Sequence, residues 1–390
     1  MRIALLIANG YGVGGTIRTV FNLAQGLSHQ HDVEIVSVVQ HREEPFFSLP
    51  PGVRMRSLAL SRKWRDRPDQ DWATRSRERV GSWRLPRGEA RRKGDIFNSH
   101  TERALYDYLR RTDADLVIGT RPGLNLLLAR WAPPRVLTIG QEHVHLANHR
   151  RDTRTSIRRW YPRLGGLTTL TETDRRDYAR ELSVDPGWLT TMPNPLSPGP
   201  YPQSTLDNPI IGAASRITHT KQFPKLVAAF ARVARDRPDW QLRIYGHGDA
   251  TPQLRQEVLR QGMHNQVAIM GATKDVFGEL AKCSIMGVSS RTEGFGMSLI
   301  EAFAVGVPVV SFDCPHGPRE IITDGQDGLL VPHQDVSALA AGLARLMDNP
   351  TERQHMGAAA RAAAAHYTPE VVAKQWQDYL RHRGTAATVT

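Results

Sequence analysis

The sequence predicts two α/β domains, each built on a doubly wound parallel sheet. Short apolar segments alternate with longer segments of helical period through most of the chain, which is the pattern of strands and their crossover helices. Five prolines between Pro193 and Pro202 interrupt this alternation, and that density excludes a helix or an inner strand. With 390 residues, the chain is also long enough to bury two cores. We therefore expect the first domain to span residues 1–197.

In the N-terminal half, apolar segments typical of buried strands are separated by segments of helical period. Strands are expected at residues 3–8, 32–39, 53–60, 116–119, 136–139 and 167–170, and helices at 16–27, at 99–111, from 125 and from 171. The segment from about 61 to 94 is rich in Arg and Trp and breaks this pattern. We expect either an inserted helical hairpin or a mobile loop there.

The alternation restarts after the prolines. Strands are expected at 210–213, 241–245, 267–270, 285–289 and 307–312, and helices at 223–235, 251–261, 276–283, 297–304 and 337–347. Doubly wound sheets bind ligands outside the carboxyl ends of their strands. Two such domains joined by a stiff hinge are therefore expected to face one another across a cleft that holds the ligand.

The charge of the chain indicates an anionic partner. The net charge is +12 and the pI is about 10.1. Residues 54–93 hold 14 Lys and Arg against 5 Asp and Glu, and a second group of arginines lies at 150–163. Two interpretations stay open: an ordinary soluble basic surface, or a landing surface for a phosphate-bearing polymer, lipid headgroups or nucleic acid. Trp64, Trp72 and Trp83 suit either a binding interface or an insert anchored on the core.

Some classes of protein are disfavoured. The apolar run at 3–8 is too short for a signal peptide, and no run approaches the roughly 18 residues of a membrane span. We expect a cytoplasmic protein and leave peripheral contact with the inner membrane face open. Cys283 and Cys314 are the two cysteines, which argues against a disulfide framework or a zinc site.

The strongest chemical signal is a glycine-rich turn bracketed by two glutamates, Glu293 and Glu301. The strand at 285–289 would deliver this turn to the carboxyl end of the sheet. Gly294 and Gly296 allow the backbone to approach a ligand closely, and the free N–H groups of the following helix favour an anion. The two carboxylates can accept hydrogen bonds from sugar and ribose hydroxyls, so the turn fits a diphosphate with a sugar on each side.

Two cations follow the first strand of the second domain. Arg216 and Lys221 leave the carboxyl end of the strand at 210–213, at the same sheet edge as Glu293. They could neutralise a diphosphate leaving group without a metal ion.

These segments resemble the retaining GT-B glycosyltransferases of family 4, including members that build or decorate cell-surface polymers such as teichoic acids. The matching positions are Glu293 and Glu301, Arg216 and Lys221, residues 245–248, Met270 and Gly271, Asn194 and Pro195, and residues 312–320 and 324–332. The resemblance implies a GT-B architecture with a nucleotide-sugar domain at 198–368. It also implies that residues 369–390 form a helix and tail that return to the acceptor-binding N-terminal domain.

The resemblance assigns roles residue by residue. The catalytic positions that it implies are His143, Arg216, Lys221 and Glu293. The donor-binding positions are Gly14, Gly15, Gly246, Met270, Gly294, Phe295, Gly296, Met297 and Glu301. Arg18 and Arg121 are candidate acceptor-binding residues. Arg121 follows the strand at 116–119 and would face the same cleft.

The resemblance further implies front-face transfer with retention, in which the leaving phosphate takes the acceptor's proton, although the residues alone leave an inverting route open. We expect no metal ion and no other cofactor. Asp113 and Asp115 precede a strand and so lie at the wrong sheet edge for catalysis, and Asp69 and Asp71 stand among arginines that would compete with a cation.

We therefore expect a glycosyltransferase that moves a hexose or N-acetylhexosamine, from a UDP-sugar first, to an anionic polymer, a lipid-linked acceptor or a small molecule. One alternative is a GDP-mannose-dependent mannosyltransferase. Another is a non-catalytic protein that binds polyanions, although no specific nucleic-acid signature is present. A dinucleotide oxidoreductase is disfavoured, because Ile17 and Thr251 stand where the phosphate-binding fingerprint needs glycine.

Overall fold

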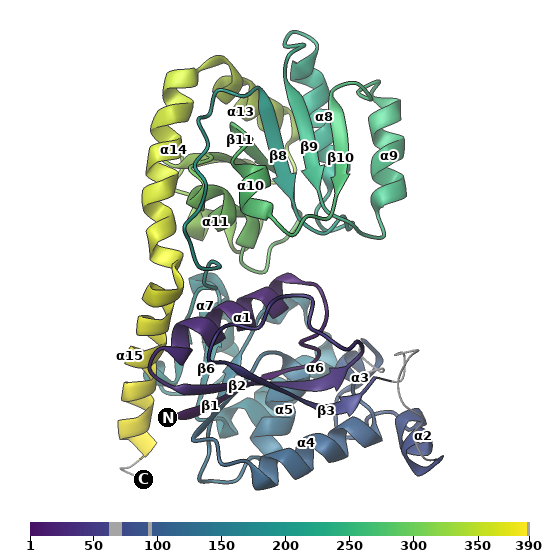
Figure 1. Ribbon diagram of the computed structural model, residues 1–390, viewed down its shortest axis with the longest axis vertical. Coiled ribbons are helices and arrows are strands. Elements are labelled where there is room, and N and C mark those ends of the chain that lie inside the picture. The colour runs from purple at the N-terminus through teal and green to yellow at the C-terminus, as the bar shows by residue number, and fades with distance from the viewer. Residues whose placement is uncertain (62–71, 93–95, 388–390) are drawn as a thin grey trace. The chain divides into compact units, whose positions relative to one another are not determined.

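The computed structural model describes residues 1–61, 72–92 and 96–387 (Figure 1). The chain divides into two compact units, and each is described by itself. The first comprises Met1–Ser197 with Pro369–Thr390, and the second comprises Pro198–Thr368. Arg62, Lys63, Trp64, Arg65, Arg67, Asp69 and Asp71 lie outside the described residues.

The N-terminal unit is built on a seven-stranded sheet in the order β3-β2-β1-β4-β5-β6-β7, and all of its strand pairs are parallel. Its strands are β1 (Arg2–Ile7), β2 (Asp32–Gln40), β3 (Arg54–Leu60), β4 (Leu116–Gly119), β5 (Leu137–Gln141), β6 (Gly166–Thr169) and β7 (Leu189–Thr191). Strands β1 and β4 are buried almost throughout, as expected where helices cover both faces of a parallel sheet.

Helices cover both faces of this sheet (Figure 1). One face packs against α1 (Gly15–Ser28) and α15 (Pro369–Ala387). The other packs against α4 (Ser99–Arg111), α5 (Pro122–Trp131), α6 (Arg151–Trp160) and α7 (Glu172–Glu181). The last helix of the chain is fixed here because Trp376 is fully buried and Tyr379 donates a hydrogen bond to the carbonyl of Trp188 at 2.8 Å.

The C-terminal unit has a six-stranded parallel sheet in the order β10-β9-β8-β11-β12-β13. Its strands are β8 (Ile210–Ala214), β9 (Gln241–Tyr245), β10 (Val267–Gly271), β11 (Ile285–Val288), β12 (Val309–Phe312) and β13 (Gly328–Val331). Helix α8 (Phe223–Ala234) packs against α9 (Thr251–Arg260) and α13 (Val336–Asp348), whereas α11 (Met297–Ala304) packs against α10 (Val276–Leu280) and α14 (Pro350–Ala364).

Several elements differ from the sequence prediction. Helix α5 begins three residues earlier than expected, because Pro122 occupies its first turn. The expected helix at 276–283 ends at Leu280, and the strand expected from 307 begins at Val309. Strands β7 and β13 and helix α6 were not expected, since the strands are three and four residues long and α6 buries only Thr153 and Ile157 beneath its arginines.

The described part of the basic insert is neither a helical hairpin nor a plain loop. It contains two short helices, α2 (Trp72–Arg79) and α3 (Arg87–Arg92), that pack on different neighbours. Helix α2 packs on α4, whereas α3 packs on α5 and α6. The backbone N–H of Gly88 donates to Asp152 of α6 at 2.9 Å, which fixes α3 there. In the part of the chain that the structure describes, no helix combines the length and the apolar character that crossing a membrane requires.

Candidate functional site

The loops that carry the two cations and the glutamate predicted from the sequence lie at the switch point of the C-terminal sheet. The strand order reverses between β8 and β11, so the loops after these strands diverge and leave a crevice at their carboxyl ends. Residues 215–222 follow β8, and residues 289–296 follow β11. The ammonium Nζ of Lys221 lies 2.6 Å from each carboxylate oxygen of Glu293, while Arg216 is exposed at the start of its loop.

Neighbouring hydroxyl groups hold this ion pair. Ser290 donates to Glu293 Oε1 at 2.6 Å. Ser289 donates to the carbonyl oxygens of Lys221 and Gln222 at 3.0 and 3.1 Å, which ties the two loops together. Because Glu293 is only 7% exposed, its charge depends on these partners for compensation. The sequence placed Lys221 and Glu293 at one edge but gave no sign of their direct contact or of the two serines.

A third loop supports Lys221 through glutamine side chains. Gln222 precedes α8 with a φ of 49°, and Gln334, after β13, has a φ of 67°. Left-handed backbone is unusual for residues other than glycine. The amide of Gln334 donates to Gln222 Oε1 at 2.7 Å and accepts from Lys225. These two strained residues therefore brace one another beside Lys221, and no sequence signal predicts them.

Helix α11 begins directly after the glycine-rich turn. Gly296 has a φ of 112°, and a Cβ there would lie 2.6 Å from Leu299 Cδ1. The rings of the buried Phe295 and of Tyr367 meet in a T-shaped arrangement, with centroids 5.8 Å apart. Glu301, one turn into the helix, is also buried. The turn places the N-terminus of α11 after the carboxyl end of β11, the position in which helix N–H groups bind phosphate in doubly wound sheets.

Two glycines of the 246–248 segment position the loop that carries Arg216. A Cβ on Gly246 would lie 1.9 Å from Ser215 O, and one on Gly248 would lie 2.0 Å from Ile217 O. Glycine is needed here for packing against the protein's own backbone, whether or not Gly246 also contacts the donor. Met270, in strand β10, is 49% exposed and available to a ligand.

In the N-terminal unit, the switch point lies between β1 and β4. Gly14 and Gly15 follow β1, and a Cβ on either would meet no described atom within 4 Å. The protein's own packing therefore does not require glycine there, which leaves space for a ligand. The guanidinium of Arg18 lies 5.0 Å from the centre of the Phe47 ring.

Arg121 follows β4 and is already engaged. Its Nη2 lies 2.8 Å from Glu89 Oε2, which also accepts from the N–H of Gly123 at 3.2 Å. Glu89 therefore fixes Arg121 and the start of α5. A role for Arg121 in binding an acceptor stays a prediction, as does that of Arg18.

His143 lies two residues beyond the end of β5. Burial lowers the pKa of its imidazole from 6.5 to about 4, so the ring is neutral near pH 7. Its Nε2 atom is buried without a hydrogen-bond partner among the described residues. The two nearby histidines have carboxylate neighbours instead: His145 lies 3.7 Å from Asp174, and His149 lies 3.7 Å from Glu142.

A buried polar cluster surrounds the end of β5 and was missed by sequence reasoning. Glu142 is 1% exposed, accepts from Asn125 at 2.8 Å and accepts from the hydroxyl of Tyr161. Burial, together with this carboxylate, holds the pKa of Tyr161 well above 10. Several buried atoms of this region have no hydrogen-bond partner among the described residues: Asn125 Oδ1, both amide atoms of Gln141, Glu142 Oε2, His149 Nε2, Thr168 Oγ1 and Tyr178 Oη. Such a concentration indicates a place for water or a ligand.

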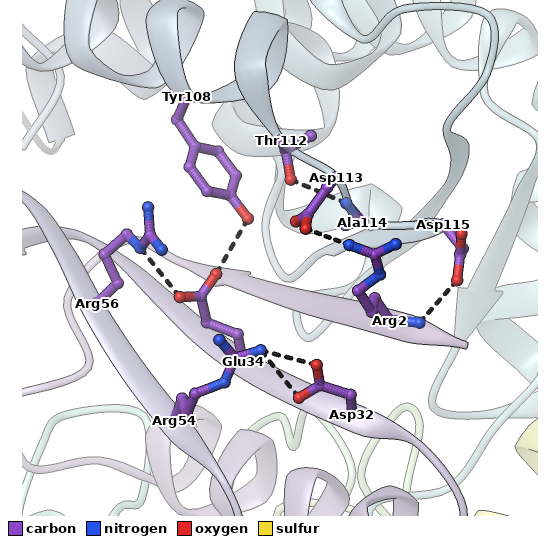
Figure 2. A network of polar contacts seen from close by, with 10 residues as sticks. All are labelled: Arg2, Asp32, Glu34, Arg54, Arg56, Tyr108, Thr112, Asp113, Ala114 and Asp115. Carbon is purple, nitrogen blue, oxygen red and sulfur yellow. Dashed lines mark hydrogen bonds and ion pairs between the residues drawn. The ribbon is translucent and has the colours of Figure 1, made fainter.

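The other aspartate pair lies at the opposite edge of the N-terminal sheet. Figure 2 shows Arg2 between Asp113 and Asp115, with its backbone N–H 2.7 Å from Asp115 Oδ2. In the same network Arg54 pairs with Asp32, and Arg56 pairs with Glu34 (Figure 2). These carboxylates lie at the amino ends of the strands and are engaged by arginines, away from the ligand-binding edge.

Two doubly wound parallel sheets are the architecture of the GT-B glycosyltransferases. The structure of a point mutant of Staphylococcus aureus TarM in complex with fondaparinux, alpha-GlcNAc-glycerol and UDP superposes with a TM-score of 0.77 and 15% identity, covering 97% of this chain and 99% of that one. Residues 202–363 match the family described as glycosyl transferases group 1. The chain therefore contains a glycosyltransferase group 1 domain.

Two relatives show how far the similarity extends. An exopolysaccharide phosphotransferase from Streptomyces coelicolor is 33% identical over 380 residues, which are 97% of this chain and 40% of that protein. A poly(ribitol-phosphate) alpha-N-acetylglucosaminyltransferase from Staphylococcus aureus is 25% identical over 215 residues, which are 55% of this chain and 43% of that protein. The chain thus spans less than half the length of both relatives.

Proposed function

We propose that this protein is a retaining glycosyltransferase that moves a hexose or N-acetylhexosamine from a UDP-sugar to an acceptor hydroxyl in the synthesis of a cell-surface polymer or glycoconjugate. One observation carries the proposal: the Lys221–Glu293 ion pair lies beside the N-terminus of α11 at the switch point of a doubly wound sheet. A nucleoside diphosphate binds to cations and to the N-terminus of a helix at such an edge, and its sugar needs a carboxylate acceptor.

The geometry gives each group a task. When the bond between the sugar's anomeric carbon and the diphosphate breaks, the electron pair leaves with the phosphate. Lys221, the exposed Arg216 and the N-terminus of α11 stabilise that charge without a metal ion. Glu293 accepts from sugar hydroxyls and holds Lys221 in place. The acceptor oxygen bonds to the anomeric carbon on the face that the phosphate leaves, and the phosphate takes the acceptor's proton.

The names of the relatives support a cell-surface polymer as the acceptor, since one concerns an exopolysaccharide and the other a poly(ribitol phosphate). They also favour a second candidate reaction. A phosphotransferase would move the sugar together with the phosphate attached to it. The bond between that phosphorus atom and the oxygen that bridges the two phosphates would break, and UMP would be released. A glycosyltransferase releases UDP. Chromatography of the nucleotide product separates the two reactions, and UMP would contradict our proposal.

The first experiment is a thermal-stability titration with UDP, GDP and NAD⁺ in the presence of EDTA. A nucleotide at about 100-fold over its Kd should add roughly 2.7 kcal/mol, which is several degrees in Tm. We expect UDP to stabilise the wild type and Lys221→Ala to abolish the effect. Lys282→Ala is the matched control, because Lys282 is an exposed lysine paired with Glu279 in the segment that precedes β11.

Lys221→Ala leaves the buried Glu293 without its cation, so the double variant Lys221→Ala/Glu293→Gln separates lost binding from lost folding. It should fold like the wild type and still fail to bind UDP. Stabilisation by GDP alone would replace the UDP-sugar with the GDP-mannose alternative. If no nucleotide raises Tm at any concentration, the proposal is wrong, and a polyanion-binding protein without catalysis becomes the better interpretation.

A further inference from the structure

A cavity of about 760 Å³ lies in the N-terminal unit between α2, α4 and the end of α5. We call it the α4 pocket. Its lining comprises three arginines, two acidic residues, two aromatic rings and one serine: Arg77, Arg84, Arg103, Glu102, Asp107, Tyr106, Trp131 and Ser99. None of these residues belongs to the proposed donor site.

The lining combines accessible cations with aromatic rings. Arg84 lies 3.7 Å from Glu102, and Arg103 pairs with Asp107 at 2.9 Å. The two arginine side chains are nevertheless 59% and 69% exposed, so the solvent-facing N–H groups of both can reach a ligand. Tyr106 meets Trp131 edge to face with centroids 5.7 Å apart, and the guanidinium of Arg84 lies 5.7 Å from the centre of the Trp131 ring. Guanidinium groups bind phosphate and carboxylate through paired hydrogen bonds, and aromatic rings provide flat apolar faces for sugar rings.

Glu102 forms the floor of the α4 pocket. It is 3% exposed, accepts from Ser82 and lies 3.7 Å from Arg84. Burial raises the pKa of its carboxyl group, while the nearby Arg84 guanidinium opposes this shift and compensates the carboxylate's charge. A buried polar floor beneath charged and aromatic walls is typical of a site that holds a discrete polar ligand.

A second group of arginines continues this surface. Arg130, Arg159 and Arg163 surround the Trp160 ring, with guanidinium carbons 4.3, 5.2 and 4.4 Å from its centre. Arg130 also donates to the carbonyl of Arg84, which joins the group to the α4 pocket. Burial and the neighbouring charge of Arg159 lower the pKa of Arg130, so positive charge is concentrated here.

The α4 pocket is connected to the carboxyl end of β4. Five residues beyond Arg84, Glu89 pairs with Arg121. Arg121 also contacts Phe97, with its guanidinium carbon 5.5 Å from the ring centre. Two residues after Phe97, helix α4 begins at Ser99, which lines the pocket. A chain held in the pocket would therefore run towards the ligand-binding edge of this sheet.

We propose that the α4 pocket binds an anionic glycan chain, with phosphate or carboxylate groups, and so holds a polymeric acceptor beside the edge where transfer takes place. The choice of a polymer rests on the proposed function, whereas the pocket itself does not. A membrane surface fits less well, because a bilayer binds protruding apolar side chains and the pocket is concave and lined by charged groups. Trp83 precedes Arg84 in the sequence and is 84% exposed, so a membrane would bind this side chain rather than the pocket.

The test measures binding of poly(glycerol phosphate) chains to the whole protein, with dextran as the neutral glycan and phosphatidylglycerol vesicles as the membrane. Arg84→Gln/Arg103→Gln removes two cations of the α4 pocket. Arg110→Gln/Arg111→Gln is the matched control, since it removes two exposed cations from the last turn of the same helix. We expect the first variant to bind the polymer at least about tenfold more weakly, equivalent to about 1.4 kcal/mol. The control should stay within about twofold of the wild type, and dextran should bind weakly to all three.

The proposal is wrong if both double variants lose the same affinity, or if vesicles bind and the polymer does not. The UDP titration keeps this test separate from the proposed function, because the α4 pocket variant should retain its full response to UDP. Loss of polymer binding in a protein that never responds to UDP would leave the polymer site standing and remove the glycosyltransferase proposal.

Discussion

The ion pair between Lys221 and the buried Glu293 links two side chains for which the sequence predicted separate ligands, a diphosphate and a sugar. Each residue compensates the other's charge, and Ser290 adds a hydrogen bond to the carboxylate. Before a donor binds, this pairing avoids the cost of a buried unpaired charge. When the donor binds, Lys221 would exchange its partner for a phosphate, and Glu293 would exchange its partner for sugar hydroxyls. The donor would therefore bind to groups that are already held in place.

His143 provides a prediction at the residue scale. Burial lowers its pKa to about 4 in the folded protein, against 6.5 in the unfolded chain. The unfolded chain therefore takes up a proton first as the pH falls, and stability should be lost between pH 6.5 and 4 with a slope of up to about 1.4 kcal/mol per pH unit. His143→Gln should flatten this part of the curve of unfolding free energy against pH, as measured by urea denaturation.

His29→Gln is the control for this measurement, because His29 is an exposed histidine. It should leave the curve of the wild type unchanged. An equal slope in the wild type and in His143→Gln would mean that His143 is not a buried neutral imidazole.

At the scale of elements, the loops after β8, β11 and β13 act as one support for the donor site. The left-handed backbones of Gln222 and Gln334 each cost about 1 kcal/mol or more, which their mutual hydrogen bond and the contact with Lys225 offset. Gln334→Ala removes both contacts and should weaken UDP binding about 5- to 30-fold, equivalent to 1–2 kcal/mol, by loosening Lys221.

Isothermal titration with UDP measures this effect, and Gln326→Ala, in an exposed turn before β13, is the control. Gln334→Glu keeps the acceptor for Lys225, so its affinity for UDP should lie between those of the wild type and Gln334→Ala. Wild-type affinity in Gln334→Ala would show that the three loops do not act together.

The elements that the sequence predicted well are those with local signals. The bounds of α4, β4 and α11 coincide with the expected ones, because Asn98 caps α4, an apolar run defines β4, and the glycine-rich turn ends at Gly296. The sequence also predicted that Lys221 and Glu293 lie at the same edge of the sheet, because both follow strands of one parallel sheet. The features that the sequence did not predict depend on tertiary contacts. A glutamate is usually exposed, and Glu142 is buried because Asn125 and Tyr161 enclose it. Helix α3 is held in place by Asp152, which belongs to a helix distant in sequence.

At the scale of the whole molecule, the end of the chain completes the core of its beginning. Helix α15 packs on α1, where a Cβ on Gly26 would lie 2.7 Å from Pro369 O, and Trp376 is fully buried against strand residues such as Leu5. Trp376→Ala should therefore destabilise the N-terminal unit by about 3–5 kcal/mol and leave the C-terminal unit unchanged.

Hydrogen exchange resolves the two units in the intact protein. In Trp376→Ala, the amides of α1 should exchange faster by about two to almost four orders of magnitude, as a loss of this size requires, while those of α8 keep the wild-type rate. Gln375→Ala, at the exposed neighbouring position, should change neither. Equal acceleration in both units would mean that they unfold as one cooperative body. Unchanged exchange in α1 would mean that the Trp376 side chain does not stabilise the N-terminal core, and that the other α15 residues of this core hold the helix without it.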